Sequence, residues 1–216
     1  MCSGGGDFRA TYFVVKFLRT AVNKKMEIET HPFEPFLPAN AKVLFLGTFP
    51  AKPSRWSMNF YYPNWINDFW RIMGLVFFEN PGRFEIKEEK RWDENAIRAF
   101  CAEKGLAFSD TAEQIRRLKG NASDASLEIV KARDITGILA SLSLCKAIAT
   151  TGGLASEVIV GRYGGEVPPV GGCRKIVIGR ELDFYRLPST SRAYPLPLSQ
   201  KASPYRYMLG QIFMLL

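Results

Sequence analysis

The segment AKVLFLG, residues 41–47, is an almost uninterrupted apolar run that ends in a glycine. This pattern is typical of a β-strand that is buried on both faces within a parallel sheet. Similar runs follow along the chain, at LAFSD (106–110), KAIATTGG (146–153), RKIVIG (174–179) and LDFYRLPS (182–189). We therefore predict a mostly parallel sheet with strands at these places.

Segments with helical spacing lie between these strands. An apolar stripe at i, i+3, i+4 and i+7 runs through NDFWRIMGLVFF (67–78) and is formed by Trp70, Met73, Gly74 and Phe77. We predict further helices at 91–104, 111–118, 124–143, 154–163 and 203–216. Because strands alternate with helices, the expected fold class is α/β, a three-layer α/β/α sandwich with a central, mostly parallel sheet. Such sheets bind ligands beyond the carboxyl ends of their strands.

The composition indicates one globular domain with an anionic partner. The chain has 216 residues, 47% of them hydrophobic, which suffices for a sizeable core. Its 29 Lys and Arg residues exceed the 21 Asp and Glu residues and give a net charge of +8. Residues 1–25 hold five basic residues and one acidic, and residues 171–216 hold seven basic and two acidic, so the positive charge lies at the two ends. Clustered basic charge favours nucleic-acid binding, although a basic surface also serves solubility alone.

The cysteines and the single histidine argue against a metal centre. Cys2, Cys101, Cys145 and Cys173 form no C-x-x-C pair, and His31 is the one imidazole. We therefore expect no metal and no cofactor, and free thiols in the reducing cytoplasm. We also expect His31 to lie far from the functional site, which leaves no Ser-His or Cys-His nucleophile.

We divide the chain into an N-terminal extension, residues 1–25, and a domain of residues 26–216. The extension is glycine-rich at its start and then apolar and basic, which suits a short helix, and Met26 is a second plausible start. No apolar run approaches the roughly 18 residues that a membrane span needs. We expect a monomer that does not bind a membrane.

Three strand exits carry unusual clusters of small, hydroxyl and proline residues. They are Gly47-Thr48-Phe49-Pro50, Thr150-Thr151-Gly152-Gly153 and Leu187-Pro188-Ser189-Thr190-Ser191-Arg192. Because the carboxyl ends of parallel strands meet at one edge of a sheet, we expect the three clusters to open on one crevice.

Three segments in this order, GTFPAKPS, YYPNWINDFW and LPSTSRAY, resemble motifs of the uracil-DNA glycosylase superfamily. The resemblance covers about residues 33 to 212 and is closest to the hypoxanthine-DNA glycosylase-like branch, whose motifs run roughly G-S-[MF]-P-S, Y-Y-x-H-P-x-N-x-F-W and L-P-S-T-S-P-A. It implies a DNA partner with a damaged or mismatched base. It also implies hydrolysis of the N-glycosidic bond of a deaminated base, uracil or hypoxanthine. No lysine lies within the matching motifs, so the expected enzyme is monofunctional, with water as the nucleophile.

The resemblance implies roles for two residues of the middle motif. Tyr62 matches the aromatic residue on which the superfamily stacks the flipped base, with Tyr61 beside it; both could instead be core aromatics. Asn67 matches the motif's asparagine and is the catalytic candidate, because its amide can donate to the leaving base or orient water. Asn67 also stands just before DFWRIM, where it would serve as a helix N-cap worth about 1 kcal/mol.

The outer motifs and the strand exit at Thr150-Thr151 supply the remaining candidates. We assign base binding to Gly47, Thr48, Phe49 and Thr151, although Gly47 could simply end a strand and Thr151 could do the same. We assign DNA binding to Ser189, Thr190, Ser191 and Arg192, whose hydroxyls and charge suit phosphate oxygens. Further phosphate attraction is expected from Arg174, Lys175, Arg186, Lys201 and Arg206.

Several alternatives stay open. Phe49 and Leu187 are apolar where better-known branches of the superfamily carry polar residues, so a noncatalytic DNA-binding or damage-sensing module on the same fold is the second hypothesis. A small-molecule hydrolase or nucleotide-binding protein is the third. Asp110 could be a general base at a strand exit, but Asp110-Thr111-Ala112-Glu113 has the outline of a helix capping box.

Overall fold

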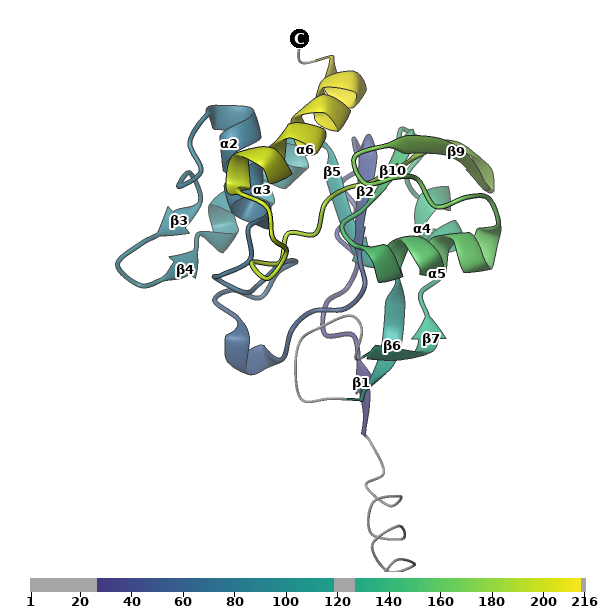
Figure 1. The fold of residues 1–216 in the computed structure, drawn as a ribbon, viewed down its shortest axis with the longest axis horizontal. Coiled ribbons are helices and arrows are strands. Elements are labelled where there is room, and N and C mark those ends of the chain that lie inside the picture. The colour runs from purple at the N-terminus through teal and green to yellow at the C-terminus, as the bar shows by residue number, and fades with distance from the viewer. Residues whose placement is uncertain (1–26, 119–126, 215–216) are drawn as a thin grey trace, which may run out of the picture.

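A five-stranded, mostly parallel sheet forms the centre of the fold (Figure 1). The computed structural model describes residues 27–118 and 127–214. The strand order is β5 (Leu106–Asp110), β2 (Val43–Gly47), β8 (Ala147–Thr150), β10 (Arg180–Arg186) and β9 (Cys173–Ile178). Only β9 runs antiparallel to its neighbour. The five strands predicted from apolar runs are therefore confirmed.

Helices cover both faces of this sheet, which confirms the α/β class. In β2, Val43 and Phe45 pack in a core with α2 (Phe69–Phe78), α3 (Glu94–Lys104) and α6 (Leu198–Phe213). Leu44 and Leu46 point to the opposite face, where they pack with α4 (Ile135–Ala140) and α5 (Gly153–Tyr163). The continuous apolar run of β2 thus arises because successive side chains enter two different cores.

A second, antiparallel sheet lies below the main one in Figure 1 and consists of β1 (Ile28–Thr30), β6 (Ala112–Arg117) and β7 (Leu127–Ala132). The helix predicted at 111–118 is wrong, because β6 pairs with a strand on each side. The one or two helices predicted within 124–143 are confirmed only in part: in the described residues of this range β7 comes first, and α4 is the helix. Long-range pairing overrides local propensity here.

The capping box at Asp110 is also absent, since no helix begins there. Asp110 ends β5, and Thr111 alone separates it from β6. The backbone N–H of Thr111 donates to the carbonyl of Gly47 at 2.9 Å, which ties this corner to the end of β2. The carboxylate of Asp110 therefore does not cap a helix.

The remaining elements complete the surface. A short hairpin of β3 (Glu85–Ile86) and β4 (Arg91–Trp92) precedes α3, and a 3₁₀ turn, η1 (Pro53–Arg55), follows β2. Helix α6 begins at Leu198, before the predicted start at residue 203. The predicted extension, residues 1–25, lies outside the described residues. In the described part of the chain, none of the helices has both the length and the apolar character for crossing a bilayer.

Candidate functional site

The order of the parallel strands places a crevice at the end of β2. The chain passes from β2 to β5 on one side and then to β8 on the other, so β2 lies at the switch point of the sheet. A pocket of about 570 Å³ opens there. Its lining comes from the segments after β1, β2, β8 and β10, from the last residue of β5 and from the chain before α2.

The pocket collects all the predicted site residues apart from Gly47. The predicted residues in its lining are Thr48, Phe49, Tyr62, Asn67, Thr151, Ser189, Thr190, Ser191 and Arg192. Gly47 lies beneath it, and a Cβ at this position would stand 2.5 Å from Oδ1 of Asp110 and 3.8 Å from the Tyr62 hydroxyl. Glycine is needed there because it leaves room for these two groups.

Tyr62 is held firmly in the pocket wall. Its ring stacks on Phe69 with a centroid distance of 3.9 Å and an interplanar angle of 3°. Its hydroxyl hydrogen-bonds with the Thr151 hydroxyl at 2.9 Å, and its φ of 54° lies in the left-handed region that non-glycine residues rarely adopt. Tyr61 also contributes to the pocket lining but is mostly buried among core aromatics. Burial raises the pKa of its hydroxyl well above the usual range, with a further rise from the charge of Asp110.

Asn67 combines a capping contact with a place in the pocket lining. Helix α2 begins at Phe69, and Oδ1 of Asn67 accepts the backbone N–H of Phe69 at 2.9 Å. The cap residue itself, Asp68, makes no side-chain cap bond. Among the described residues, the Nδ2 group of Asn67 has no hydrogen-bond partner. The amide is therefore oriented through its oxygen and keeps its donors available.

A buried ion pair anchors the loop after β10 to the start of α2. Lys201 of α6, with a side chain only 1% exposed, lies 2.8 Å from a carboxylate oxygen of Asp68. The same ammonium group donates to the carbonyl of Ser191 at 2.8 Å. The carbonyl of Thr190 in turn accepts the backbone N–H of Asp68 at 2.9 Å. The prediction that Lys201 attracts phosphate at the surface is therefore wrong, because this residue joins the loop to the start of α2.

Within the loop, serine side chains shape the backbone. Oγ of Ser189 accepts the backbone N–H of Ser191, and Oγ of Ser191 accepts that of Ala193, each at 3.3 Å. Ser191 and Arg192 are exposed, whereas Thr190 is buried. Leu187 is also buried, with 1% exposure, so this position belongs to the core and not to the pocket.

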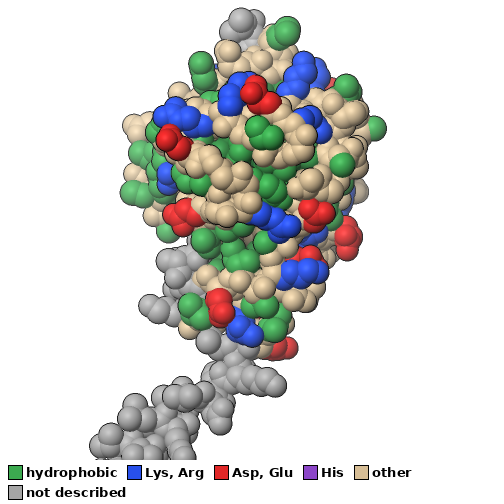
Figure 2. All heavy atoms as spheres, turned by 90° about the vertical axis from the view of Figure 1, so that its right-hand side faces the viewer, with side chains coloured by type: hydrophobic (Ala, Val, Ile, Leu, Met, Phe, Trp, Pro, Cys, Tyr) green, Lys and Arg blue, Asp and Glu red, His purple; other side chains and the backbone are tan. Residues whose placement is uncertain are grey.

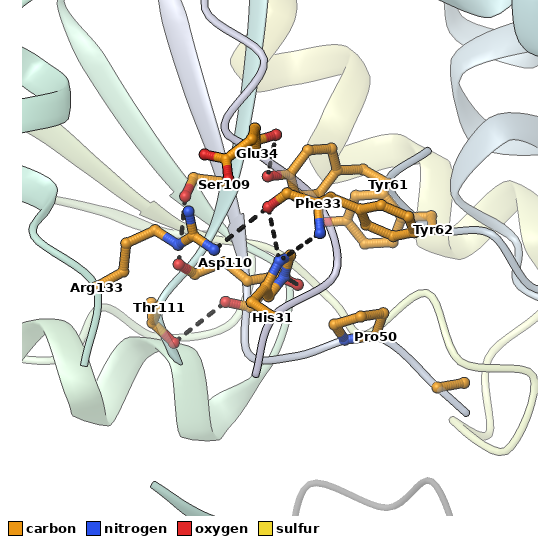
Figure 3. Close-up of polar contacts among 12 residues, drawn as sticks. His31, Phe33, Glu34, Pro50, Tyr61, Tyr62, Ser109, Asp110, Thr111 and Arg133 are labelled. Atoms are coloured by element: carbon orange, nitrogen blue, oxygen red, sulfur yellow. Dashed lines mark hydrogen bonds and ion pairs between the residues drawn. The ribbon is translucent and has the colours of Figure 1, made fainter. Parts of the chain in front are cut away.

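Sequence reasoning missed a histidine–carboxylate pair in the site (Figure 3). Nε2 of His31 lies 2.8 Å from Oδ2 of Asp110, and Asp110 lines the pocket. The expectation that His31 lies far from the site is therefore wrong. Segment 28–36 runs antiparallel along β6 and then meets β5 through a bridge between Phe36 and Phe108. An aspartate that ends a buried strand, together with the chain's one histidine, was the available signal.

The pocket lining is weakly basic, since among the described residues it holds two arginines and one carboxylate, that of Asp110. Arg55 and Arg192 both belong to the pocket lining. On the face shown in Figure 2, Lys and Arg side chains lie among Asp and Glu side chains and form no continuous patch. Among the described residues, no group of three His, Cys, Asp or Glu side chains is placed to hold a metal ion.

The fold, though not the sequence, is similar to that of a known structure. The solution NMR structure of a protein from Methanosarcina acetivorans, named as a candidate uracil-DNA glycosylase, matches with a TM-score of 0.59 and 20% sequence identity. The match covers 87% of this chain and 99% of the other. No protein-family model matches the chain, and no curated protein is matched by its sequence. The similarity thus establishes a shared fold.

Proposed function

We propose that this protein is a monofunctional DNA glycosylase of the uracil-DNA glycosylase superfamily, which hydrolyses the N-glycosidic bond of uracil or hypoxanthine in DNA. One observation carries the proposal: three separate segments that resemble the superfamily's motifs converge on one pocket at the switch point of the sheet. The fold shared with a protein named as a candidate uracil-DNA glycosylase supports it.

In this proposal the pocket receives a base that has left the DNA stack. Extrusion costs a few kcal/mol, and the enzyme recovers this cost through stacking and hydrogen bonds to the base edge. The base stacks on Tyr62, whose ring is already oriented by Phe69 and by the Thr151 hydroxyl. Since the ring does not need to be ordered on binding, less entropy is lost.

Asn67 assists the bond cleavage. As the bond between the sugar and the base breaks, the base takes the electron pair and becomes anionic. Water adds to the cation-like sugar carbon and loses a proton, and protonation of the departed base makes it neutral again. The Nδ2 group of Asn67 donates to the departing base or orients that water, while its Oδ1 remains fixed by the Phe69 N–H. Loss of one such oriented donor typically slows a reaction by about 10²–10³-fold.

The loop of residues 189–192 holds the DNA strand. Its exposed serine and arginine side chains suit contacts to phosphate oxygens beside the extruded nucleotide. The Lys201–Asp68 pair links this loop to the segment that carries Asn67. The same buried lysine therefore positions both this loop and the residue that follows Asn67.

The test is incubation with single-stranded and duplex oligonucleotides that carry uracil, hypoxanthine or xanthine. Alkali-sensitive abasic sites should form at the uracil or hypoxanthine position. Absence of cleavage for every lesion would refute the enzymatic proposal. The second candidate, a noncatalytic DNA-binding module, is favoured by one observation, the apolar Phe49 in the pocket wall, and it predicts salt-dependent binding without abasic sites.

A further inference from the structure

Arg71, in the first turn of α2, donates to the chain turn that carries Asn67. Its Nη1 group lies 2.9 Å from the carbonyl oxygen of Trp65 and 3.2 Å from that of Asn67 itself. Asn67 is also held within the turn, because its backbone N–H donates to the carbonyl of Asn64 at 2.9 Å. Asn67 lines the pocket whereas Arg71 does not, so this contact reaches the site from outside the pocket.

An ion pair with the β3–β4 hairpin fixes the guanidinium group. Nε of Arg71 lies 2.6 Å from Oε1 of Glu85 in β3, and both side chains are largely buried, with 13% and 11% exposure. Because a guanidinium is planar and rigid, a carboxylate that holds Nε also sets the direction in which Nη1 points. The hairpin lies at the outer edge of the molecule in Figure 1, and none of its described residues lines the pocket. A segment outside the site therefore supports its geometry.

Two indole rings flank the guanidinium. Cζ of Arg71 lies 4.9 Å from the ring centroid of Trp65 and 4.8 Å from that of Trp92 in β4. The indole N–H of Trp92 in turn donates to the carbonyl of Asn64 at 3.4 Å. Such a place favours arginine over lysine, because a flat guanidinium contacts ring faces while its edge makes several hydrogen bonds. Lysine can keep the charge here but cannot make all of these contacts.

We propose that Arg71 is a positioning residue for Asn67, and that the β3–β4 hairpin contributes to catalysis through it. This inference rests on the proposed function, in which the Asn67 amide acts on the departing base or on water. The amide is oriented at three points. The Phe69 N–H holds its side-chain oxygen, while Asn64 and Arg71 hold the backbone N–H and carbonyl of the same residue. A displacement of about 1 Å at a reacting centre can slow a reaction about 100-fold, so loss of one point should lower the rate.

Arg71→Lys is the main test variant, since lysine keeps the positive charge but lacks the planar fork. Single-turnover excision at saturating protein should slow by about 10- to 100-fold. Binding of a lesion-free oligonucleotide should stay unchanged, because Arg71 lies outside the pocket lining. Weaker binding with a smaller salt dependence, at an unchanged saturated rate, would indicate a phosphate contact and would overturn the inference.

A double-mutant comparison tests whether Arg71 acts through Asn67. Effects of residues that act as one unit are not additive, so in the Asn67→Ala background Arg71→Lys should slow excision by less than about 2-fold. Glu85→Gln keeps the shape of the side chain but removes its charge. It should also slow excision, and again only while Asn67 is present. This variant decides the inference if Arg71→Lys does not fold.

Arg98→Lys is the matched control, because Arg98 makes the same kinds of contact elsewhere in the fold. It pairs with Glu94 at 2.8 Å and donates to the carbonyl of Asn59 at 3.1 Å. Its Cζ also lies 4.3 Å from the ring centroid of Phe60. The excision rate of Arg98→Lys should match that of the unmodified protein. Circular dichroism and urea unfolding check that each variant is folded.

Hydrogen exchange followed by NMR reports the orientation of Asn67 without any reaction. The Phe69 N–H donates to Oδ1 of Asn67, so this amide should exchange faster in Arg71→Lys than in Arg98→Lys. Exchange at the same rate in both variants would show that Arg71 does not orient the Asn67 side chain.

Three results would overturn the inference: equal excision rates in Arg71→Lys and Arg98→Lys, an undiminished effect of Arg71→Lys in the Asn67→Ala background, or equal exchange of the Phe69 amide. Failure of the proposed function appears differently. The unmodified protein would then form no abasic sites, while exchange of the Phe69 amide would still decide whether Arg71 positions Asn67.

Discussion

Replacement of Lys201 by methionine tests how the DNA-facing loop is built. The ammonium group of Lys201 contacts the Asp68 carboxylate and the Ser191 carbonyl, each at 2.8 Å. Methionine preserves most of the side-chain volume but removes the charge. Asp68, with a side chain 12% exposed, is then left as an uncompensated carboxylate in the protein interior.

The expected loss of stability is large. Removal of one partner from a buried ion pair costs about 3–5 kcal/mol, because the remaining charge stays desolvated. Removal of both charges costs less, since no isolated charge remains. The double variant Lys201→Met/Asp68→Asn should therefore recover more than half of the loss, and the coupling within the double-mutant cycle should exceed about 1 kcal/mol.

Urea unfolding followed by circular dichroism measures these differences. Lys175→Met is the matched control, because Lys175 is an exposed lysine that bridges Asp183 at 2.8 Å on the surface. Its urea midpoint should equal that of the unmodified protein within error, as exposed ion pairs add little. A Lys201→Met variant as stable as the control would refute the reasoning that this pair is buried and coupled.

Three further predictions follow from the site and the core. Gly47→Ala places a Cβ 2.5 Å from Oδ1 of Asp110 and should lower the free energy of unfolding by about 1–3 kcal/mol; unchanged stability in urea would contradict the crowding. Burial raises the pKa of the Cys101 and Cys145 thiols, so less of the reactive thiolate forms at either residue. Mass spectrometry should therefore find iodoacetamide adducts at these two cysteines in the unfolded protein but not in the native protein. Adducts at either residue in the native protein would be inconsistent with this burial. Arg192→Ala should reduce the slope of log affinity for DNA against log salt by about one, while Arg91→Ala should not; equal slopes would exclude a phosphate contact by Arg192.

The central sheet was predictable because its signal is local. The apolar runs at β2, β5 and β8 reflect burial on two faces, and each run shows this without knowledge of its neighbours. The antiparallel sheet was not predictable in this way. In β6 the sequence AEQIRR suits a helix, and its strand form depends on pairing with Ile28–Thr30, more than 80 positions away in the chain.

In the candidate site, too, the sequence predicted the features that have a local signal and missed those that depend on distant pairing. Motifs that lie at strand exits pointed to the pocket, because the geometry of parallel strands brings such exits together. His31 and Asp110 are 79 positions apart and belong to no common local pattern. Their contact depends on β1 pairing with β6, which was the part of the fold that sequence reasoning missed.

Single-turnover excision tests the proposed glycosylase activity most directly. An excess of protein is mixed with an oligonucleotide that carries uracil or hypoxanthine, and abasic sites are counted over time. The protein should form them, Asn67→Ala should form them about 10²–10³-fold more slowly, and the exposed Asn59→Ala should match the unmodified protein. Equal rates for Asn67→Ala and Asn59→Ala would contradict the assignment of the pocket as the catalytic site.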